Sequence, residues 1–183
     1  DVLHAREDMA CRPIGLYGAQ KLAIEALLRA RLVRTDCRLL VLRIGNPYGL
    51  GQESQPAHGV IGRIFNCMRD HDEFTIWGDG TQVRDYVHVS DVARAFVHTL
   101  AFDGPEELFN IGSGEGVDTD TLVRMCEEVS GVALQYARRP KAAYEVDRIS
   151  LDIGAAAQHL RWQPSMTLRE GLTMYFRQLV EMT

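Results

Sequence analysis

The sequence lacks several features by which common classes of protein are recognised. Its 183 residues contain no run of about 18 apolar residues, and its first residues carry no apolar core of the kind found in signal peptides. The formal net charge of −5 gives no general reason to expect nucleic acid or an anionic membrane as a partner. We therefore expect a protein that is neither exported nor held in a membrane.

Cysteine is scarce and shows no pattern. The four cysteines, Cys11, Cys37, Cys67 and Cys126, are scattered without the spacing of metal ligands, so we expect no metal site. As free thiols they indicate a reducing compartment, which favours the cytoplasm. Internal repeats, low-complexity tracts and linkers are also missing, although the chain is long enough to bury a sizeable core.

A dinucleotide-binding fingerprint is missing too. Gly112, Gly114 and Gly116 lie between a predicted strand and a predicted helix, which superficially copies such a turn. The fingerprint requires its third glycine one position later and an acidic residue about twenty positions further on, and neither is in place. We interpret these glycines as an ordinary connection between a strand and a helix.

What the sequence does contain is an alternation of helical and strand patterns typical of an α/β fold. A helix at 119–129 is expected to begin at Asp118 or Thr119 and to end near Gly131, and Ser90 or Asp91 is expected to cap the helix before it. Residues 1–12 look irregular. The other expected helices span 16–33, 60–68, 92–102, 153–160 and 167–182, and the expected strands span 37–44, 74–77, 107–111 and 132–136.

A tyrosine and a lysine near the start of the first helix are the leading candidates for catalysis. Tyr17 and Lys21 are four residues apart, so a helix places them on one face, about one turn from each other. A phenol is a poor base at neutral pH, but a nearby ammonium favours the phenolate, which suits proton exchange with a sugar or alcohol hydroxyl. In isolation, the same spacing would equally fit a solvated pair.

The residues around this pair carry a family resemblance. Pro13, Tyr17, Gly18-Ala19, Lys21 and Glu25 resemble the catalytic helix of the extended short-chain dehydrogenase/reductase family, the NAD-dependent nucleotide-sugar epimerases and dehydratases. The resemblance implies the carboxyl-terminal part of a Rossmann-type doubly wound sheet plus a smaller α/β substrate-binding domain. It also implies NAD as cofactor, with Tyr17 as the base and Lys21 holding the nicotinamide ribose.

A second motif follows the strand at 37–44. Residues 42–52 resemble the family segment R-x-x-N-x-Y-G-P-G-Q, with Leu50 in place of the usual proline. The resemblance assigns Asn46 to the substrate diphosphate and the backbone at Ile44 and Gly45 to the nicotinamide end of NAD. The alternative is that Asn46 is a turn residue and that Arg43 forms a surface ion pair.

The longest match is residues 78–93, which resemble the family signature G-D-G-x-x-x-R-D-Y-x-x-V-x-D-V-A. Arginine suits a diphosphate because it is always charged and offers paired donors, so we expect Arg84 to bind the substrate phosphates. The alternative is a structural salt bridge with Asp85. Tyr86, His88 and Asp91 are interpreted as architectural residues that hold the turn and cap the helix.

Further substrate contacts are implied by resemblance alone. Val60, Ile61, Thr75 and Trp77 match segments that wall the uridine pocket of the epimerases, although the sequence by itself would place them in the core. Glu145 matches the acid of a family Arg-x-x-Asp pair, but Ala142 replaces the arginine. Arg139 or Lys141 could reach the same anion from a shifted position, and a solvated basic turn is the alternative.

In the family, the dinucleotide fingerprint and the catalytic Ser or Thr both lie upstream of the segment that matches this sequence. The resemblance therefore implies the carboxyl-terminal part of a longer enzyme, which binds NAD tightly only with its amino-terminal Rossmann half. We expect residues 1–52 to end the dinucleotide-binding domain and 53–183 to form the substrate-binding region, with 86–111 returning to the first domain. The helix at Tyr17 and the strand at Leu39 should then leave an apolar sheet edge unpaired.

The implied activity is NAD-dependent epimerisation at C4 of a UDP-hexose or UDP-N-acetylhexosamine through a 4-keto intermediate, by an enzyme that is a homodimer at full length. Sugar-polymer synthesis is the usual setting. A nucleotide-sugar 4,6-dehydratase is the alternative reaction, although Ser54 to His58 stand where dehydratases usually carry a Glu-Lys pair. A non-catalytic nucleotide-sugar binding module is the alternative from another class.

Overall fold

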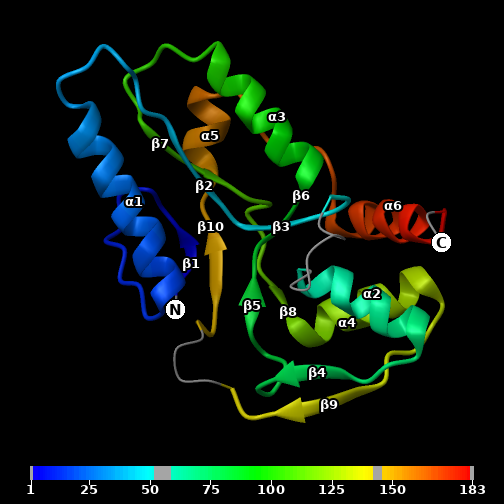
Figure 1. The fold of residues 1–183 in the computed structure, drawn as a ribbon. Coiled ribbons are helices and arrows are strands. Elements are labelled where there is room, and N and C mark those ends of the chain that lie inside the picture. The colour runs from blue at the N-terminus through cyan, green and yellow to red at the C-terminus, as the bar shows by residue number, and fades with distance from the viewer. Residues whose placement is uncertain (1, 52–58, 142–145, 182–183) are drawn as a thin grey trace.

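The computed structural model describes residues 2–51, 59–141 and 146–181 (Figure 1). Helices and short strands alternate along these residues. The helices are α1 (Leu16–Leu32), α2 (Val60–Asp70), α3 (Val89–Leu100), α4 (Thr119–Ser130), α5 (Gly154–His159) and α6 (Leu168–Glu181). The strands are β1 (Val2–Ala5), β2 (Val41–Ile44), β3 (Asn46–Tyr48), β4 (Phe74–Trp77), β5 (Val83–Arg84), β6 (Tyr86–His88), β7 (Leu108–Ile111), β8 (Val117–Asp118), β9 (Tyr136–Arg139) and β10 (Ile149–Leu151).

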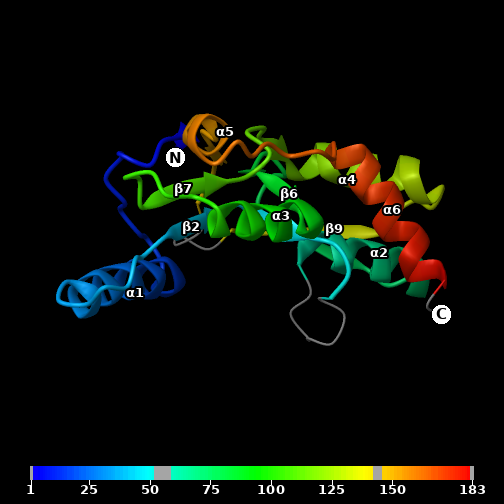
Figure 2. The ribbon, with the colours of Figure 1, turned by 90° about the horizontal axis from the view of Figure 1, so that it is seen from above.

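Most strand pairs are parallel, as expected of an α/β fold. β2 pairs with β7, β3 with β6, β1 with β10 and β4 with β9 in parallel, while β5 and β8 are antiparallel. The chain passes from β6 through α3 to β7, which lies beside β2. Figure 2 shows α1 set apart from α3 and α5, which both pack with β7 in one core.

The buried side chains form two separate cores. The first gathers residues of α2, β4, α4 and α6, with Phe65, Ile76, Leu122 and Tyr175 among its most buried members. The second lies between α3, β7 and α5, and its largest side chain is Trp162, which is 1% exposed. Each core contains a different set of helices. Figure 1 shows that the molecule extends from α1 at one end to α6 at the other.

Helix α1 stands apart from both cores. None of its residues is buried, and Leu16 and Leu27 are 75% and 68% exposed. Beside it, β2 pairs with β7 along one edge, and in the part of the chain that the structure describes no strand pairs along its other edge. The predicted helix is confirmed.

Several predicted elements match the structure closely. β4 has the bounds predicted for it, and α4 begins and ends within one residue of the prediction. The Asp118 carboxylate accepts a hydrogen bond from the Thr121 amide at 2.8 Å, and Gly131 ends the helix in the left-handed conformation with φ of 71°. These ends follow from local capping chemistry, which is why the sequence was sufficient to find them.

Other predictions were wrong. The strand predicted at 132–136 is β9, Tyr136–Arg139, because the pairing with β4 selects the later residues. The cap of α3 is His88, whose Nδ1 accepts from the Ser90 amide at 3.2 Å, and not Ser90 or Asp91. The amino-terminal residues contain β1, held by its parallel pairing with β10.

Candidate functional site

The predicted catalytic pair lies on one exposed face at the start of α1. The Tyr17 side chain is 74% exposed, and Lys21 Nζ lies 5.3 Å from the centroid of its ring. A Cβ atom on Gly18 would lie 3.2 Å from Pro13 Cβ, so glycine lets the incoming chain pack tightly against the first turn. The pair can therefore exchange protons with a ligand that approaches this end of α1.

An ion pair ties this helix to the sheet. Arg43 in β2 donates to both carboxylate oxygens of Glu25 in α1, from Nε to Oε1 at 3.0 Å and from Nη2 to Oε2 at 2.8 Å. This hydrogen bonding lowers the pKa of Glu25 from its ordinary value. The surface pair considered for Arg43 is thus a partly buried pair, and it fixes α1 relative to β2.

The end of β2 carries the residues predicted to face the nicotinamide and the substrate. The Gly45 amide donates to Ile111 O at 2.8 Å, and the Asn46 amide donates to Asp85 O at 2.7 Å. A Cβ atom on Gly45 would lie 2.8 Å from the same Asp85 oxygen, so only glycine fits. Ile44 is the last residue of β2 and directly precedes Gly45 and Asn46.

Arg84 closes β5 and is partly buried. Its guanidinium donates to the carbonyl oxygens of Val146 at 2.7 Å, Val83 at 2.8 Å and Asp147 at 3.3 Å. The structural alternative, a salt bridge to Asp85, is not what the structure has, because the Asp85 carboxylate accepts from Ser113 and from two further backbone amides. Arg84 thus lies beside the segment that follows residue 145. The predicted contact Glu145, like Ala142, lies outside the described residues.

The predicted uridine-wall residues are divided between core and surface. Ile61 is 1% exposed and belongs to the first core, and Val60 packs against that core. Thr75 is half-buried, whereas Trp77 is 52% exposed. The structure therefore brings Ile61 into the core, as the sequence alone suggested, and leaves Trp77 available at the surface.

The basic residues near β9 differ in their surroundings. Lys141 forms an ion pair with Asp147, and Arg138 donates to both oxygens of Asp120 at 2.9 Å. Arg139 is exposed and lies in register with Trp77 across the β4–β9 pair. Of these three, Arg139 shares a strand face with a predicted substrate contact.

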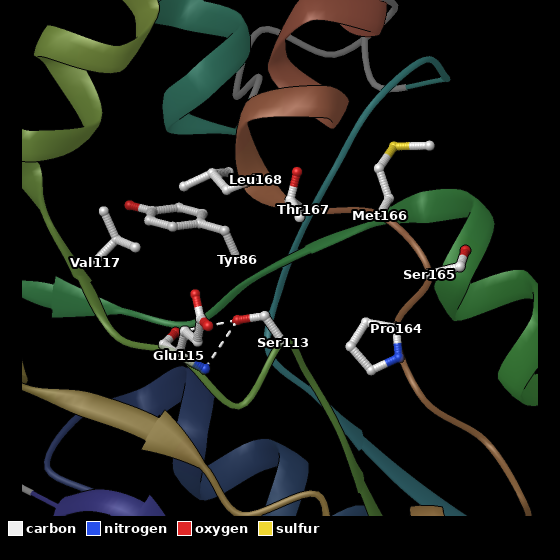
Figure 3. A pocket seen from close by; sticks show the side chains of 9 residues that line it. All are labelled: Tyr86, Ser113, Glu115, Val117, Pro164, Ser165, Met166, Thr167 and Leu168. Atoms are coloured by element: carbon white, nitrogen blue, oxygen red, sulfur yellow. Dashed lines mark hydrogen bonds between the residues drawn. The ribbon is translucent and has the colours of Figure 1, made fainter.

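A small cavity was not foreseen from the sequence. Its volume is about 180 Å³, and Figure 3 shows the ring of Tyr86 and the Ser113 side chain at its wall. Ser113 Oγ donates to the Asp85 carboxylate at 2.7 Å and accepts from the Glu115 amide at 3.1 Å. Burial raises the pKa of Tyr86 to about 12, which keeps its hydroxyl protonated. The remaining lining comes from Val117, Pro164, Ser165, Met166, Thr167 and Leu168.

The described residues show neither a metal cluster nor a membrane-spanning helix. Over residues 2–51, 59–141 and 146–181, no group of three or more His, Cys, Asp or Glu side chains is arranged to hold a metal ion. Within the same ranges, no helix combines the length and the apolar character needed to cross a membrane.

Comparison with known proteins places this arrangement in context. The chain is 32% identical over 166 residues to a dTDP-4-dehydro-6-deoxyglucose reductase of Escherichia coli, with 91% of this chain and 52% of the relative covered. It is 31% identical over 182 residues to a UDP-glucose 4-epimerase of Corynebacterium glutamicum, with 91% of this chain and 55% of the relative covered. The chain thus spans about half the length of the curated relatives it matches.

Solved structures agree with the sequence comparison. The structure of UDP-glucose 4-epimerase from Thermotoga maritima with UDP-glucose superposes with a TM-score of 0.92 at 31% identity, covering 100% of this chain and 59% of that chain. MoeE5 in complex with UDP-glucuronic acid and NAD also superposes with a TM-score of 0.92 at 31% identity, covering 100% and 61%.

The fold is therefore that of the carboxyl-terminal part of a Rossmann-type enzyme with a smaller α/β part attached. Residues 2–112 match the sequence pattern of the NAD dependent epimerase/dehydratase family, which is more than half of the chain. With its tyrosine and lysine paired on α1, this chain belongs to that family, whose cofactor is NAD.

Proposed function

We propose that the chain supplies the catalytic helix and the substrate-binding region of an enzyme that epimerises a nucleotide sugar at C4 through a 4-keto intermediate. The observation that carries this proposal is the position of Lys21 Nζ, 5.3 Å from the centroid of the exposed Tyr17 ring. Tyr17 takes the proton of the C4 hydroxyl and later returns it, and the ammonium of Lys21 favours the phenolate that does so.

The residues present fit the reactive end of NAD. Tyr17 and Lys21 offer a hydroxyl and an ammonium on an exposed face of α1, and Ile44 and Gly45 lie at the end of β2. Those residues and the backbone of Ile44 would hold the nicotinamide ribose. When bound, NAD accepts a hydride from the sugar carbon and gives it back. The protein contributes position and a base.

The substrate is proposed to be a UDP-hexose or UDP-N-acetylhexosamine. Arg84 would bind its diphosphate with Asn46, and Glu145 would contribute from the neighbouring segment. Val60, Ile61, Thr75 and Trp77 would form the uridine side of the pocket, with Trp77 as the member whose side chain is most exposed. A UDP-sugar is favoured because several of the relatives that the chain matches are UDP-glucose 4-epimerases, although a dTDP-L-rhamnose 4-epimerase of Burkholderia thailandensis is also 32% identical.

The proposed enzyme is larger than this chain. We propose that residues 1–52, together with 86–111, complete a dinucleotide-binding domain. The glycine-rich turn for NAD would come from a further part of the enzyme, which corresponds to the part of the relatives that this chain does not match. The uncovered apolar side chains of α1 support packing of that part, and of a second copy in a homodimer, against the helix. The substrate-binding region would then be formed by 53–183.

The test is product analysis. The full-length protein that carries this chain is incubated with NAD and either UDP-glucose or UDP-N-acetylglucosamine, and the sugars are separated by chromatography. The expected product is the C4 epimer. A 4-keto-6-deoxy sugar would instead identify a dehydratase, and binding of the UDP-sugar without conversion would identify a non-catalytic binding module.

A further inference from the structure

Asp85 places a buried carboxylate where three segments of the chain meet. The residue is 2% exposed and lies between β5 and β6. Its Oδ1 accepts from the amide and the hydroxyl of Ser113, at 2.6 and 2.7 Å. Its Oδ2 accepts from the amides of Leu151 at 3.1 Å and Gly114 at 3.2 Å. One side chain therefore satisfies donors that follow β7 and a donor in β10.

This arrangement explains the glycine-rich turn that resembles a phosphate-binding site. The amides of Ser113 and Gly114 converge on one anion, as amides of such turns do, and the anion is the carboxylate of Asp85. A Cβ atom on Gly112 would lie 2.6 Å from Asp85 Oδ2, so the turn is shaped around the carboxylate. The donors of this turn are occupied from within the chain.

The backbone of Asp85 contacts the segment that follows β2. Its carbonyl oxygen accepts from the Asn46 amide at 2.7 Å and is the atom that a Cβ on Gly45 would meet. Its neighbour in the sequence is Arg84, whose guanidinium holds the carbonyls of Val146 and Asp147. The two proposed diphosphate contacts, Asn46 and Arg84, are thus both attached to this one residue.

We propose that Asp85 is the positioning residue of the nucleotide-sugar site, which fixes Asn46 and Arg84 relative to each other so that both reach the diphosphate. The proposal rests on the proposed function and adds a residue to it that acts through its neighbours and does not itself touch the ligand. A carboxylate suits this role because it accepts four hydrogen bonds and donates none. An asparagine in its place would turn an NH₂ group toward two of the four donors.

The chain offers a matched control at Asp91. This carboxylate is also buried, at 1% exposed, and it accepts from the Ser165 hydroxyl at 2.7 Å, the Ser165 and Met166 amides, and Arg94. It holds the segment after Trp162 against α3, and none of these partners is a proposed site residue. Asp85 and Asp91 thus match in burial and in accepting from backbone amides and a serine hydroxyl, and they differ in what they support.

The experiment compares Asp85→Asn with Asp91→Asn in the full-length protein. Thermal unfolding measures the structural cost, and calorimetry with UDP measures the affinity for the nucleotide diphosphate. We expect both variants to unfold at lower temperature, but the Kd for UDP to rise about tenfold or more in Asp85→Asn alone. The KM for UDP-glucose should rise with the Kd, with a smaller change in kcat, because Tyr17 is not held by Asp85.

Two results separate this inference from the proposed function. Unchanged UDP affinity in Asp85→Asn would overturn the positioning role and leave the function standing. A wild-type protein that binds no UDP would overturn the substrate assignment and this inference with it. If Asp85→Asn does not fold, Ser113→Ala removes one donor to the carboxylate, and a rise of about twofold or more in the UDP Kd is expected, whereas none would overturn the proposal.

Discussion

Glu25 and Arg43 form a two-point ion pair that joins α1 to strand β2. The side chains are 18% and 25% exposed, so the pair is shielded more than the exposed pair between Arg29 and Glu107 on the same helix. Because α1 has no buried residue, this contact is a main constraint on where Tyr17 and Lys21 stand.

Replacement of Glu25 by glutamine should lower the free energy of unfolding by about 1–2 kcal/mol at neutral pH, because Arg43 loses a charge-assisted bond. Arg43 lowers the pKa of Glu25 below its ordinary 4.5, so the stabilisation is complete above that pH and is lost as pH falls through the lower, folded-state pKa. Urea denaturation between neutral pH and pH 3 should show the wild type and the variant converging in acid. The control, Glu107→Gln, should change stability little.

Tyr17→Phe should lower turnover by a factor of about 10²–10⁴, because the proton of the sugar hydroxyl loses its acceptor. Affinity for UDP-glucose should stay near the wild-type value, since the hydroxyl is needed for the reaction and the ring is retained. Kinetics and calorimetry on one preparation measure both. Tyr136→Phe removes a hydroxyl from another exposed tyrosine and should leave both quantities unchanged; a Tyr17→Phe enzyme of full activity would eliminate the proposed base.

Arg84→Lys should weaken UDP binding about tenfold although the charge is kept, because lysine cannot offer paired donors to a diphosphate and also hold the carbonyls of Val146 and Asp147. Calorimetry with UDP measures the effect. Arg124→Lys changes an exposed arginine of α4 that donates to Thr121, and should bind UDP normally. Equal affinity in the two variants would mean that the phosphate contact lies elsewhere.

His88 predicts a pH dependence of stability. Burial lowers the pKa of His88 from its ordinary 6.5, so as pH falls below 6.5 the unfolded chain binds a proton that the folded protein excludes. Stability should therefore fall as pH decreases from 6.5 toward the lower, folded-state pKa. His88→Asn keeps a capping side chain that does not titrate, and its stability should vary less over this range in thermal unfolding measured from pH 5 to 8. A slope identical to that of the wild type would assign the dependence to other groups.

Local signals in the sequence were sufficient for most helices and for β4, because helical periodicity and capping depend on residues close in the chain. β9 was misplaced because its bounds are set by pairing with β4, some sixty residues away, as in the register of Trp77 with Arg139. β1 escaped notice for the same reason, since it is held by its pairing with β10 and by Asn110 of β7, which lie far along the chain.

The candidate site divides in a similar way. Tyr17 and Lys21 could be paired from their spacing, because a helix fixes their geometry. The role of Asp85 could not, because its partners Ser113, Gly114 and Leu151 lie in segments that only the fold brings together. From the sequence, Asp85 was considered as an ion-pair partner of its neighbour Arg84. In the structure the buried carboxylate accepts from backbone amides instead.

Two neighbouring residues of strand β6 belong to different cores, Tyr86 to the first and Val87 to the second. The polypeptide then visits the two interiors in turn, returning to the first at Leu122, to the second at Ala156 and to the first again at Leu172. No single break in the sequence separates the residues of one core from those of the other. The two cores therefore cannot be exchanged as two contiguous segments of the sequence.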